Sequence, residues 1–266
     1  MKTKINSLKV ISLVTAATFF ISCKKSSDDP YNPVHNVNAV VKSASGDSAA
    51  IVTKLNEFRV LAGDPLNMAP GATTGRREVN WDAVPGIFTN ANNFPFDFFG
   101  AADVSLPNGR KRGLILTGIG TSFRVDSTSF SDIENTYADQ FKIFSKKRLF
   151  ASIGNNVIQV TFKVPGTTND AFVKGFAVIF CDVDDAYSTT VEYFNGAKSL
   201  GVFRAIPAAQ GFSFVGVSFP DDKVTRVQIA PGNGSLATGV KDISNGGAKD
   251  LVVMDDFIYD EPKQLN

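Results

Sequence analysis

Residues 157–182 read VIQVTFKVPGTTNDAFVKGFAVIFCD and show the clearest β pattern in the chain. Apolar and polar side chains alternate over residues 157–164, which is typical of a strand with one buried and one solvated face. Pro165-Gly166 is a turn signal, and residues 173–182 predict a second, more apolar strand. The two segments therefore indicate strands of an antiparallel sheet.

Similar short segments continue on both sides of this stretch, separated by turn signals such as Asn195-Gly196. The expected strands are residues 78–82, 114–118, 122–125, 157–164, 173–182, 190–194, 200–204, 212–219, 224–230 and 251–259. The alternation of strands with helices that accompanies a parallel sheet is absent. We therefore expect an all-β domain over residues 65–266, built as an antiparallel β-sandwich of the jelly-roll type.

One helix is expected before the sandwich, over residues 46–64. Asp47 or Ser48 can cap its start, Gly63 ends it and Pro65 prevents its continuation. Apolar side chains recur at helical spacing at Ile51, Val52, Leu55, Phe58 and Leu61. This apolar face predicts that the helix packs on the sandwich.

The first 22 residues resemble a bacterial lipoprotein signal peptide. Three lysines, at positions 2, 4 and 9, precede the apolar run of residues 10–21. That run is shorter than the about 20 residues of a membrane-spanning helix, and a short apolar run after a basic start is typical of an export signal. Phe20-Ile21-Ser22-Cys23 is similar to a lipobox, with Phe20 in place of the usual leucine. The resemblance implies cleavage before Cys23 and acylation of Cys23, so that acyl chains attach the protein to a membrane.

Residues 23–45 are expected to form a flexible tether between Cys23 and the folded domain. The segment is polar, contains Pro30 and Pro33, and shows neither helical nor strand periodicity. Its acidic pair Asp28-Asp29 resembles a surface-export signal of some Gram-negative bacteria. The expected location is the cell envelope, with the chain lipid-anchored in the outer membrane and exposed at the cell surface.

Composition excludes several chemistries. His35 is the only histidine and falls in the tether, which removes histidine-based catalysis and histidine-liganded zinc. Cys181 is the only cysteine besides Cys23, and its apolar neighbours predict a buried, inert thiol. Removing the three signal lysines from 27 basic residues leaves 24, against 26 acidic ones, and no basic stripe indicates nucleic acid as a partner.

Five further segments are GRREVNWD at residues 75–82, RLF at 148–150, VTF at 160–162, GFAVIFCDVD at 175–184 and VVMDDFIY at 252–259. Together they resemble a group of uncharacterised bacterial proteins, secreted or attached to the envelope, that end in a strand similar to DDFIYGEP. This chain has Asp260 at the glycine position of that ending. The resemblance spans residues 55–262 and is compatible with the jelly-roll interpretation. It implies no reaction and no catalytic residue.

Calcium is the cofactor that the acidic residues suggest, because Ca²⁺ binds carboxylate and carbonyl oxygens. Asp182, Asp184 and Asp185 lie at the end of the long apolar strand. The i, i+2 spacing of Asp182 and Asp184 places both on one face of that strand. A loop that follows the strand can add carbonyl or amide ligands.

An alternative calcium site uses acids from the two ends of the domain. First and last strands often pair in sandwich folds, and that pairing would bring together Glu78, Asp82, Asp255 and Asp256. The same acids can instead accept backbone hydrogen bonds or pair with neighbouring arginines. The sequence is compatible with both interpretations.

The expected function is binding of a glycan or another surface polymer without catalysis, with calcium as a possible aid. Aromatic rings stack on sugar C–H surfaces, and the candidate rings are Trp81, Tyr187 and Tyr193. Tyr187 follows the acids at 182–185 directly, whereas Trp81 also suits a core position. A structural or protein-interaction module of the envelope is the alternative. A glycoside hydrolase, which needs a suitably spaced pair of carboxylates, is the enzymatic possibility.

Overall fold

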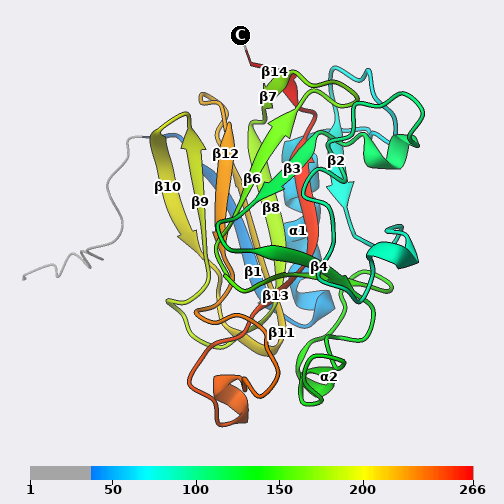
Figure 1. Cartoon of the computed structure of the whole chain (residues 1–266). Helices are drawn as coiled ribbons and strands as arrows, with labels where there is room; N and C mark the ends of the chain where they lie inside the picture. Colours follow the sequence, from blue (N-terminus) through cyan, green and yellow to red (C-terminus); the bar gives the residue numbers. More distant parts are fainter. Residues whose placement is uncertain (1–36, 266) are drawn as a thin grey trace, which may run out of the picture. The chain divides into compact units, whose positions relative to one another are not determined.

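The computed structural model describes residues 37–265 and places them in two antiparallel sheets, with one long helix outside the first sheet (Figure 1). The first sheet has the order β1 (Val40–Gly46), β11 (Ala208–Ser218), β8 (Gly175–Val183), β13 (Val253–Asp260), β5 (Leu149–Ile153) and β4 (Ser122–Asp126), and β2 (Arg76–Val79) also pairs with β13. The second has the order β10 (Lys198–Arg204), β9 (Thr190–Asn195), β12 (Arg226–Ala230), β6 (Ile158–Lys163), β7 (Asp170–Phe172) and β14 (Lys263–Gln264), and β3 (Leu114–Thr117) also pairs with β6. The expected antiparallel sandwich is confirmed.

Strand β8 separates two hydrophobic cores, and all of its residues are buried. Phe176 and Phe180 belong to the core between the sheets. Ile179 and Cys181 belong to the core between the first sheet, the helix and the outer loops. Because both faces of β8 are covered, its sequence is apolar without alternation. Strand β6 has one covered face and alternates buried with half-buried residues, as predicted.

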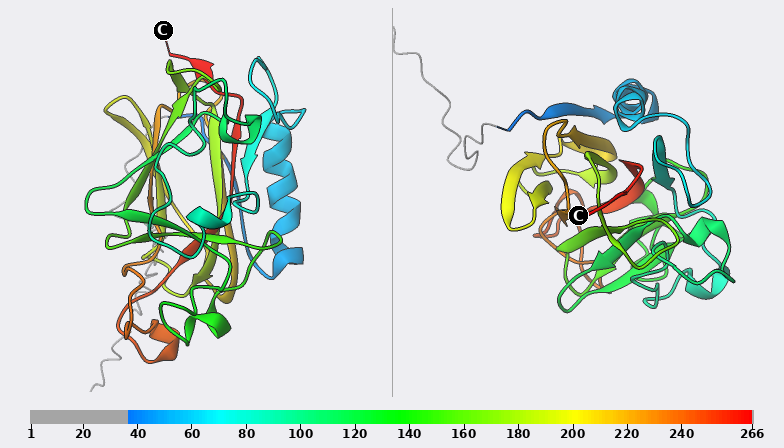
Figure 2. Two further views of the ribbon diagram at one scale, coloured as in Figure 1. Left: turned by 45° about the vertical axis from the view of Figure 1, so that its right-hand side comes forward. Right: turned by 90° about the horizontal axis from the view of Figure 1, so that it is seen from above.

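Helix α1 (Ser48–Ala62) covers the outer face of the first sheet, as the two views of Figure 2 show. Asp47 caps it by accepting a backbone N–H from its first turn (2.9 Å), as predicted. Phe58 packs edge-on against Phe214 of β11, with 6.2 Å between ring centroids. Glycine is required at position 216, because a Cβ there would lie 2.7 Å from the Phe58 ring.

The N-terminal boundary of the folded domain differs from the prediction. Residues 40–45, expected in the tether, form most of β1, which pairs with β11 along its whole length. The sequence pattern also misses β5, β7 and β14. The expected signal peptide, Cys23 and residues 24–36 of the expected tether lie outside the described residues. None of the described helices is long and apolar enough to cross a membrane.

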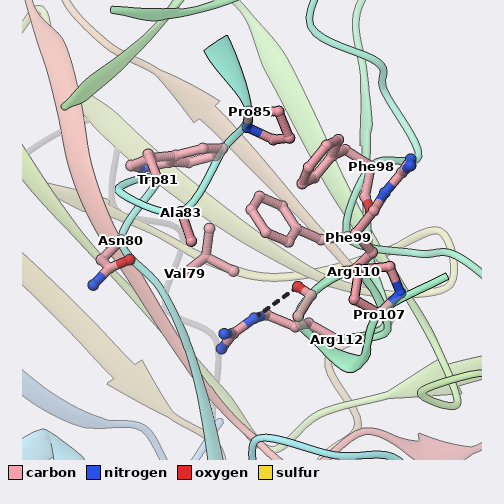
Figure 3. A pocket seen from close by; sticks show the side chains of 11 residues that line it. Val79, Asn80, Trp81, Ala83, Pro85, Phe98, Phe99, Pro107, Arg110 and Arg112 are labelled. Atoms are coloured by element: carbon pink, nitrogen blue, oxygen red, sulfur yellow. Dashed lines mark hydrogen bonds between the residues drawn. The ribbon is translucent and has the colours of Figure 1, made fainter. Parts of the chain in front are cut away.

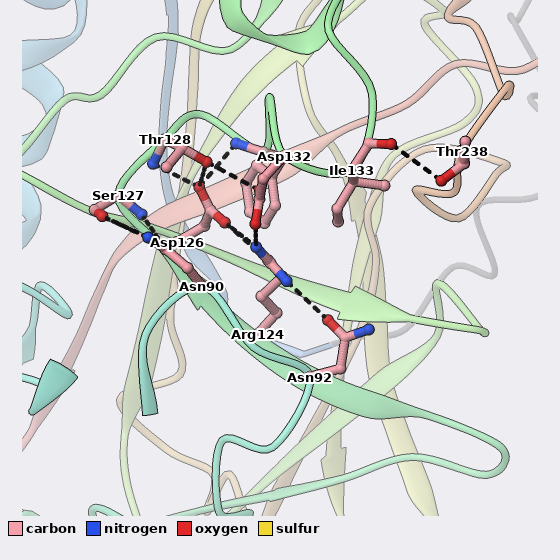
Figure 4. A network of polar contacts seen from close by, with 10 residues as sticks. Asn90, Asn92, Arg124, Asp126, Ser127, Thr128, Asp132, Ile133 and Thr238 are labelled. Atoms are coloured by element: carbon pink, nitrogen blue, oxygen red, sulfur yellow. Dashed lines mark hydrogen bonds and ion pairs between the residues drawn. The ribbon is translucent and has the colours of Figure 1, made fainter. Parts of the chain in front are cut away.

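Two loops lie beyond the end of the sandwich where β8 finishes, at the bottom of Figure 1. One contains the short helix α2 (Tyr137–Gln140), and the other contains the 3-10 helix η3 (Ile243–Asn245). Figure 4 shows that Arg124 of β4 holds the first loop through ion pairs with Asp126 (2.7 Å) and Asp132. Thr238 of the second loop donates to the carbonyl of Ile133 in the first (3.1 Å). The two loops therefore form one joined structure.

Candidate metal centre

Three carboxylates converge at the end of β8. Asp182 and Asp184 belong to β8 and the residue after it, and Asp242 directly precedes η3. One carboxylate oxygen of each residue lies within 4.8 Å of the others. Asp182 and Asp242 are fully buried, and Asp184 is half-buried. Carboxylates this close in a buried environment need either protons or a cation between them.

The backbone at the end of β8 is shaped to turn the Asp182 side chain into this cluster. Asp182 has a φ of +67°, in the left-handed region that residues other than glycine seldom adopt. The register between β8 and β11 shifts opposite this position, which is the mark of a β-bulge. On the bulged strand, the Gln210 N–H donates to Oδ1 of Asp182 (2.6 Å). Oδ2 of Asp182 has no hydrogen-bond partner among the described residues.

Asp242 enters the cluster because it caps η3. Its Oδ2 accepts from the backbone N–H and the hydroxyl of Ser244 (both 2.7 Å). Its Oδ1 accepts from the backbone N–H of Leu251 (2.7 Å). These bonds fix the carboxylate against the start of β13. Position 242 is thereby held beside a strand end sixty residues earlier in the chain.

A fourth acid, Asp250, closes the loop that follows β8. Its carboxylate accepts from the backbone N–H of Asp184 (3.2 Å) and of Asp185 (3.1 Å), and from the hydroxyl of Ser188. The loop of residues 184–188 is therefore built around acidic side chains.

Gln140, at the end of α2, supplies the observation that points to a ligand. Its side chain is only 1 % exposed, and neither its amide oxygen nor its amide nitrogen has a hydrogen-bond partner among the described residues. The amide lies close enough to Asp182 to lower the pKa of that carboxyl. Oδ2 of Asp184 is also buried without a partner. Buried polar atoms are almost always satisfied, so these oxygens are available as ligands for a cation.

The raised pKa values of the acids show the electrostatic cost of ionising them in this buried cluster. Burial raises the pKa of Asp182 to about 6, against the opposing effect of the Gln210 N–H. Burial, together with the carboxylate of Asp242, raises the pKa of Asp184 to about 7. Burial also raises the pKa of Asp250. A divalent cation would stabilise the ionised forms and remove this cost.

The donor set favours calcium. All candidate ligand atoms are oxygens: the carboxylates of Asp182, Asp184 and Asp242, and the amide oxygen of Gln140. Ca²⁺ takes six to eight oxygens from carboxylates, amides, backbone carbonyls and water. Zinc prefers nitrogen and sulfur ligands. The nearby sulfur, that of Cys181, already accepts a hydrogen bond from the Lys142 N–H (3.0 Å).

The predicted set of Asp182, Asp184 and Asp185 is brought together only in part. Asp185 is not part of the cluster and accepts the backbone N–H of Tyr187 (2.9 Å). Asp242 and Gln140 take part instead, and sequence reasoning missed both. The sequence Asp242-Ile243-Ser244 signals a cap, because Asp and Ser favour such turns. It contains no signal for proximity to Asp182.

The alternative set of Glu78, Asp82, Asp255 and Asp256 is not assembled into a metal site. Strands β2 and β13 do pair, with Ile258 opposite Glu78. Asp255 and Asp256 are neighbours in β13, but the other acids of the set have partners of their own. Glu78 forms ion pairs with Arg59 (2.8 Å) and Arg76 (2.7 Å). Asp82 accepts two backbone N–H groups from residues 146 and 147, and Asp255 accepts two from residues 144 and 145.

The three candidate aromatic residues have different environments. Trp81 is 1 % exposed, stacks on Phe150 at 4.1 Å and donates to the carbonyl of Asp255 (2.7 Å). Tyr193 is fully buried and donates to the carbonyl of Phe176 (2.9 Å). Both belong to the core between the sheets. Full burial excludes Tyr193 as a residue that contacts a ligand, whereas Trp81 also lines a separate cavity. Tyr187 is 73 % exposed.

Tyr187 lies on the loop that Asp250 holds. The guanidinium carbon of Arg204 lies 5.4 Å from the centroid of its ring, which is within cation–π range. This leaves an exposed aromatic ring beside the acidic cluster.

Comparisons with known proteins do not identify the chain. No protein-family model matches it, and no curated protein does. Among solved structures, the K2 cleaved adhesin domain of Lys-gingipain is similar over 70% of this chain and 99% of that chain, at 11% identity and a TM-score of 0.36.

Proposed function

We propose that this chain is a calcium-binding, non-catalytic module of the bacterial cell envelope that binds a glycan or another surface polymer. The observation that supports this most strongly is the cluster of Asp182, Asp184 and Asp242, in which one buried oxygen each of Asp182 and Asp184 has no partner and the Gln140 amide lies close to Asp182.

The role of the cation follows from where its ligands originate. They come from the end of β8, from α2 and from the segment before η3. Because Asp182 and Asp242 are fully buried, the cation is enclosed by protein and not open to a substrate. Calcium therefore fixes the loops at this end of the sandwich.

The fixed loops present Tyr187. Its exposed ring offers a flat apolar face to the C–H surface of a sugar, and the guanidinium of Arg204 lies beside that ring. Binding of this kind requires stacking and hydrogen bonds but no acid–base pair. The dependence of polymer binding on calcium is indirect, through the order of residues 184–188.

Attachment to the envelope completes the proposal and rests on the sequence of the first 23 residues. Acyl chains on Cys23 would hold the sandwich at the membrane through the polar segment that begins at Lys24. A surface position places the Tyr187 loop where it can meet extracellular polymers.

The test is a glycan-array screen of soluble Lys24–Asn266, performed once with Ca²⁺ and once with EDTA. We expect binding in Ca²⁺ that is weakened in EDTA and lost in Tyr187→Ala. Asp170→Asn, at an exposed carboxylate of β7 paired with Lys163, is the matched control for a change of charge. Absence of binding in both buffers would exclude the glycan and favour a structural or protein-binding role.

A further inference from the structure

A separate hollow of about 260 Å³ opens at the end of β2. Apolar side chains line its inside, and Figure 3 shows the rings of Phe98 and Phe99 on one side, facing Trp81 and Val79 on the other. Arg110 and Arg112 also line it. An apolar cavity with two cations at its edge is suited to a ligand that combines an apolar body with a negative charge.

Arg112 is positioned by the backbone alone. Its Nε donates to the carbonyl of Gly109 (3.1 Å) and its Nη1 donates to the carbonyl of Glu78 (2.5 Å). Among the described residues, no carboxylate forms an ion pair with Arg112, and its Nη2 donates to no protein atom. The carboxylate of Glu78 is engaged by Arg59 and Arg76.

Arg110 is positioned in a similar way. Its Nε donates to the carbonyl of Phe98 (3.3 Å), and its guanidinium carbon lies 4.3 Å from the centroid of the Phe98 ring. Within residues 37–265 it also forms no ion pair. Both guanidinium groups are therefore held in place with N–H donors that the protein leaves available.

The surroundings of Arg112 oppose its charge. Partial burial lowers the pKa of this guanidinium, and the nearby cation of Arg77 acts in the same direction, whereas Tyr259 and Glu78 act against it. Arg112 is half-buried, and cations that are withdrawn from water are normally paired. An anion bound beside Arg112 would supply the missing partner.

We propose that this hollow binds a small organic carboxylate with an apolar ring or chain. The apolar part would lie in the hollow against Trp81, Phe98 and Phe99, which pack on one another and line it, and the carboxylate would accept hydrogen bonds from Arg112 and Arg110. A volume of about 260 Å³ lies near the lower end for ligand pockets, which limits the occupant to a small molecule. A neighbouring hollow that shares Arg112 is also lined by Glu78 and Asp82, whose charges would repel an anion.

The experiment titrates 3-phenylpropanoate against the full-length chain in detergent, followed by ligand-observed NMR, with empty micelles as the blank. The neutral amide, 3-phenylpropanamide, has the same ring and chain without the charge. We expect saturable binding of the carboxylate, with an affinity at least about tenfold above that of the amide. Failure of the carboxylate to bind saturably, or equal affinity for the amide, would overturn the proposal. EDTA should leave the affinity unchanged, which separates this result from the calcium site.

Variants locate the binding. Arg112→Gln and Arg110→Gln should each weaken carboxylate binding by about tenfold, and Ala83→Phe, at the rim, should block it. Arg226→Gln is the matched control, because Arg226 also lies over a phenylalanine ring, that of Phe194 in the second sheet (3.5 Å). An equal loss in Arg226→Gln would overturn the proposal. If Arg112→Gln does not fold, the other two variants decide.

Discussion

Asp182 and Asp185 lie three residues apart, but only Asp182 faces the acidic cluster. Asp182 has an unpartnered buried oxygen, whereas Asp185 accepts the backbone N–H of Tyr187. We predict that Asp182→Asn and Asp242→Asn each weaken Ca²⁺ binding by more than about tenfold, because each removes one charged ligand from the set. Asp185→Asn should retain the wild-type affinity. Isothermal titration of the three variants measures this, and a loss in Asp185→Asn equal to that in Asp182→Asn would contradict the ligand set.

Tyr187 and Tyr193 show how exposure separates a binding residue from a core residue. Tyr187→Ala should weaken polymer binding by about 2 kcal/mol or more and change the free energy of unfolding by less than about 0.5 kcal/mol. Tyr193→Phe removes the hydrogen bond to the carbonyl of Phe176, which should cost about 1 kcal/mol of stability and leave binding intact. Binding measurements and denaturant unfolding on both variants test the assignment. The reverse pattern would place the polymer site elsewhere.

At the scale of elements, β13 contains two adjacent buried acids at a shift in its register with β8. Burial and the neighbouring Asp255 carboxylate raise the pKa of Asp256 to about 9, while Glu78 and Arg59 also face it with opposite effects. In the unfolded chain the pKa of Asp256 is near 3.8. Between about pH 4 and pH 9, the folded chain therefore keeps a proton on Asp256 that the unfolded chain has lost. The stability contributed by this proton is therefore complete at acidic pH and is lost as the pH rises through about 9.

This sign gives a test with Asp256→Asn, which cannot titrate. The unfolding free energy of the wild type, minus that of Asp256→Asn, should fall as the pH rises from about 6 to about 10. Urea unfolding at several pH values measures the difference. Asp170→Asn, at an exposed carboxylate, should follow the wild-type profile. A difference that stays constant or rises with pH would show that Asp256 is ionised in the folded chain.

The sequence predicts those helices and strands whose own apolar pattern determines which side chains are buried. Strands β6 and β8 and helix α1 have strong apolar patterns, and each forms close to its expected position. Strand β1 (VVKSASG) is rich in small and polar residues and exists because β11 offers it a free edge. Strand β14 has only two residues and depends on β7 in the same way. These strands are products of pairing across long sequence distances, which local patterns do not contain.

The candidate site was predictable to a similar extent and for the same reason. Asp182 and Asp184 follow a strong strand, so their common position at its end could be read from spacing. Gln140 and Asp242 lie near these two acids only because the two loops that contain them are joined beyond the end of β8. One of the joining contacts is the hydrogen bond from the Tyr137 hydroxyl to the carbonyl of Val240 (2.7 Å). Trp81 and Tyr193 show the converse, since an aromatic residue alone does not reveal whether tertiary packing will cover it.

For the whole molecule, the two cysteines give a paired test of membrane attachment. Cys23→Ser should abolish acylation and release the chain from the membrane fraction, because the thioether cannot form. Cys181→Ala should remain acylated and membrane-bound, since Cys181 is fully buried and burial raises the pKa of its thiol far above the usual range. Mass spectrometry of the N-terminal peptide and membrane fractionation measure both variants. Detection of acyl chains in Cys23→Ser would contradict the lipoprotein interpretation.

Bound calcium should connect segments that are distant in the chain and stabilise them together. If one ion joins the end of β8, α2 and the segment before η3, then saturating Ca²⁺ at about 100 times its dissociation constant adds about 2.7 kcal/mol to the unfolding free energy. Local opening of residues 127–148 and 231–252 should be suppressed together, because both segments provide ligands to the same ion. Hydrogen exchange followed by mass spectrometry, in Ca²⁺ and in EDTA, measures each segment separately, and α1 serves as the internal control because its caps and packing involve none of the ligands. Protection that appears in only one of the two loops, or equally in α1, would mean that the acids do not share a cation.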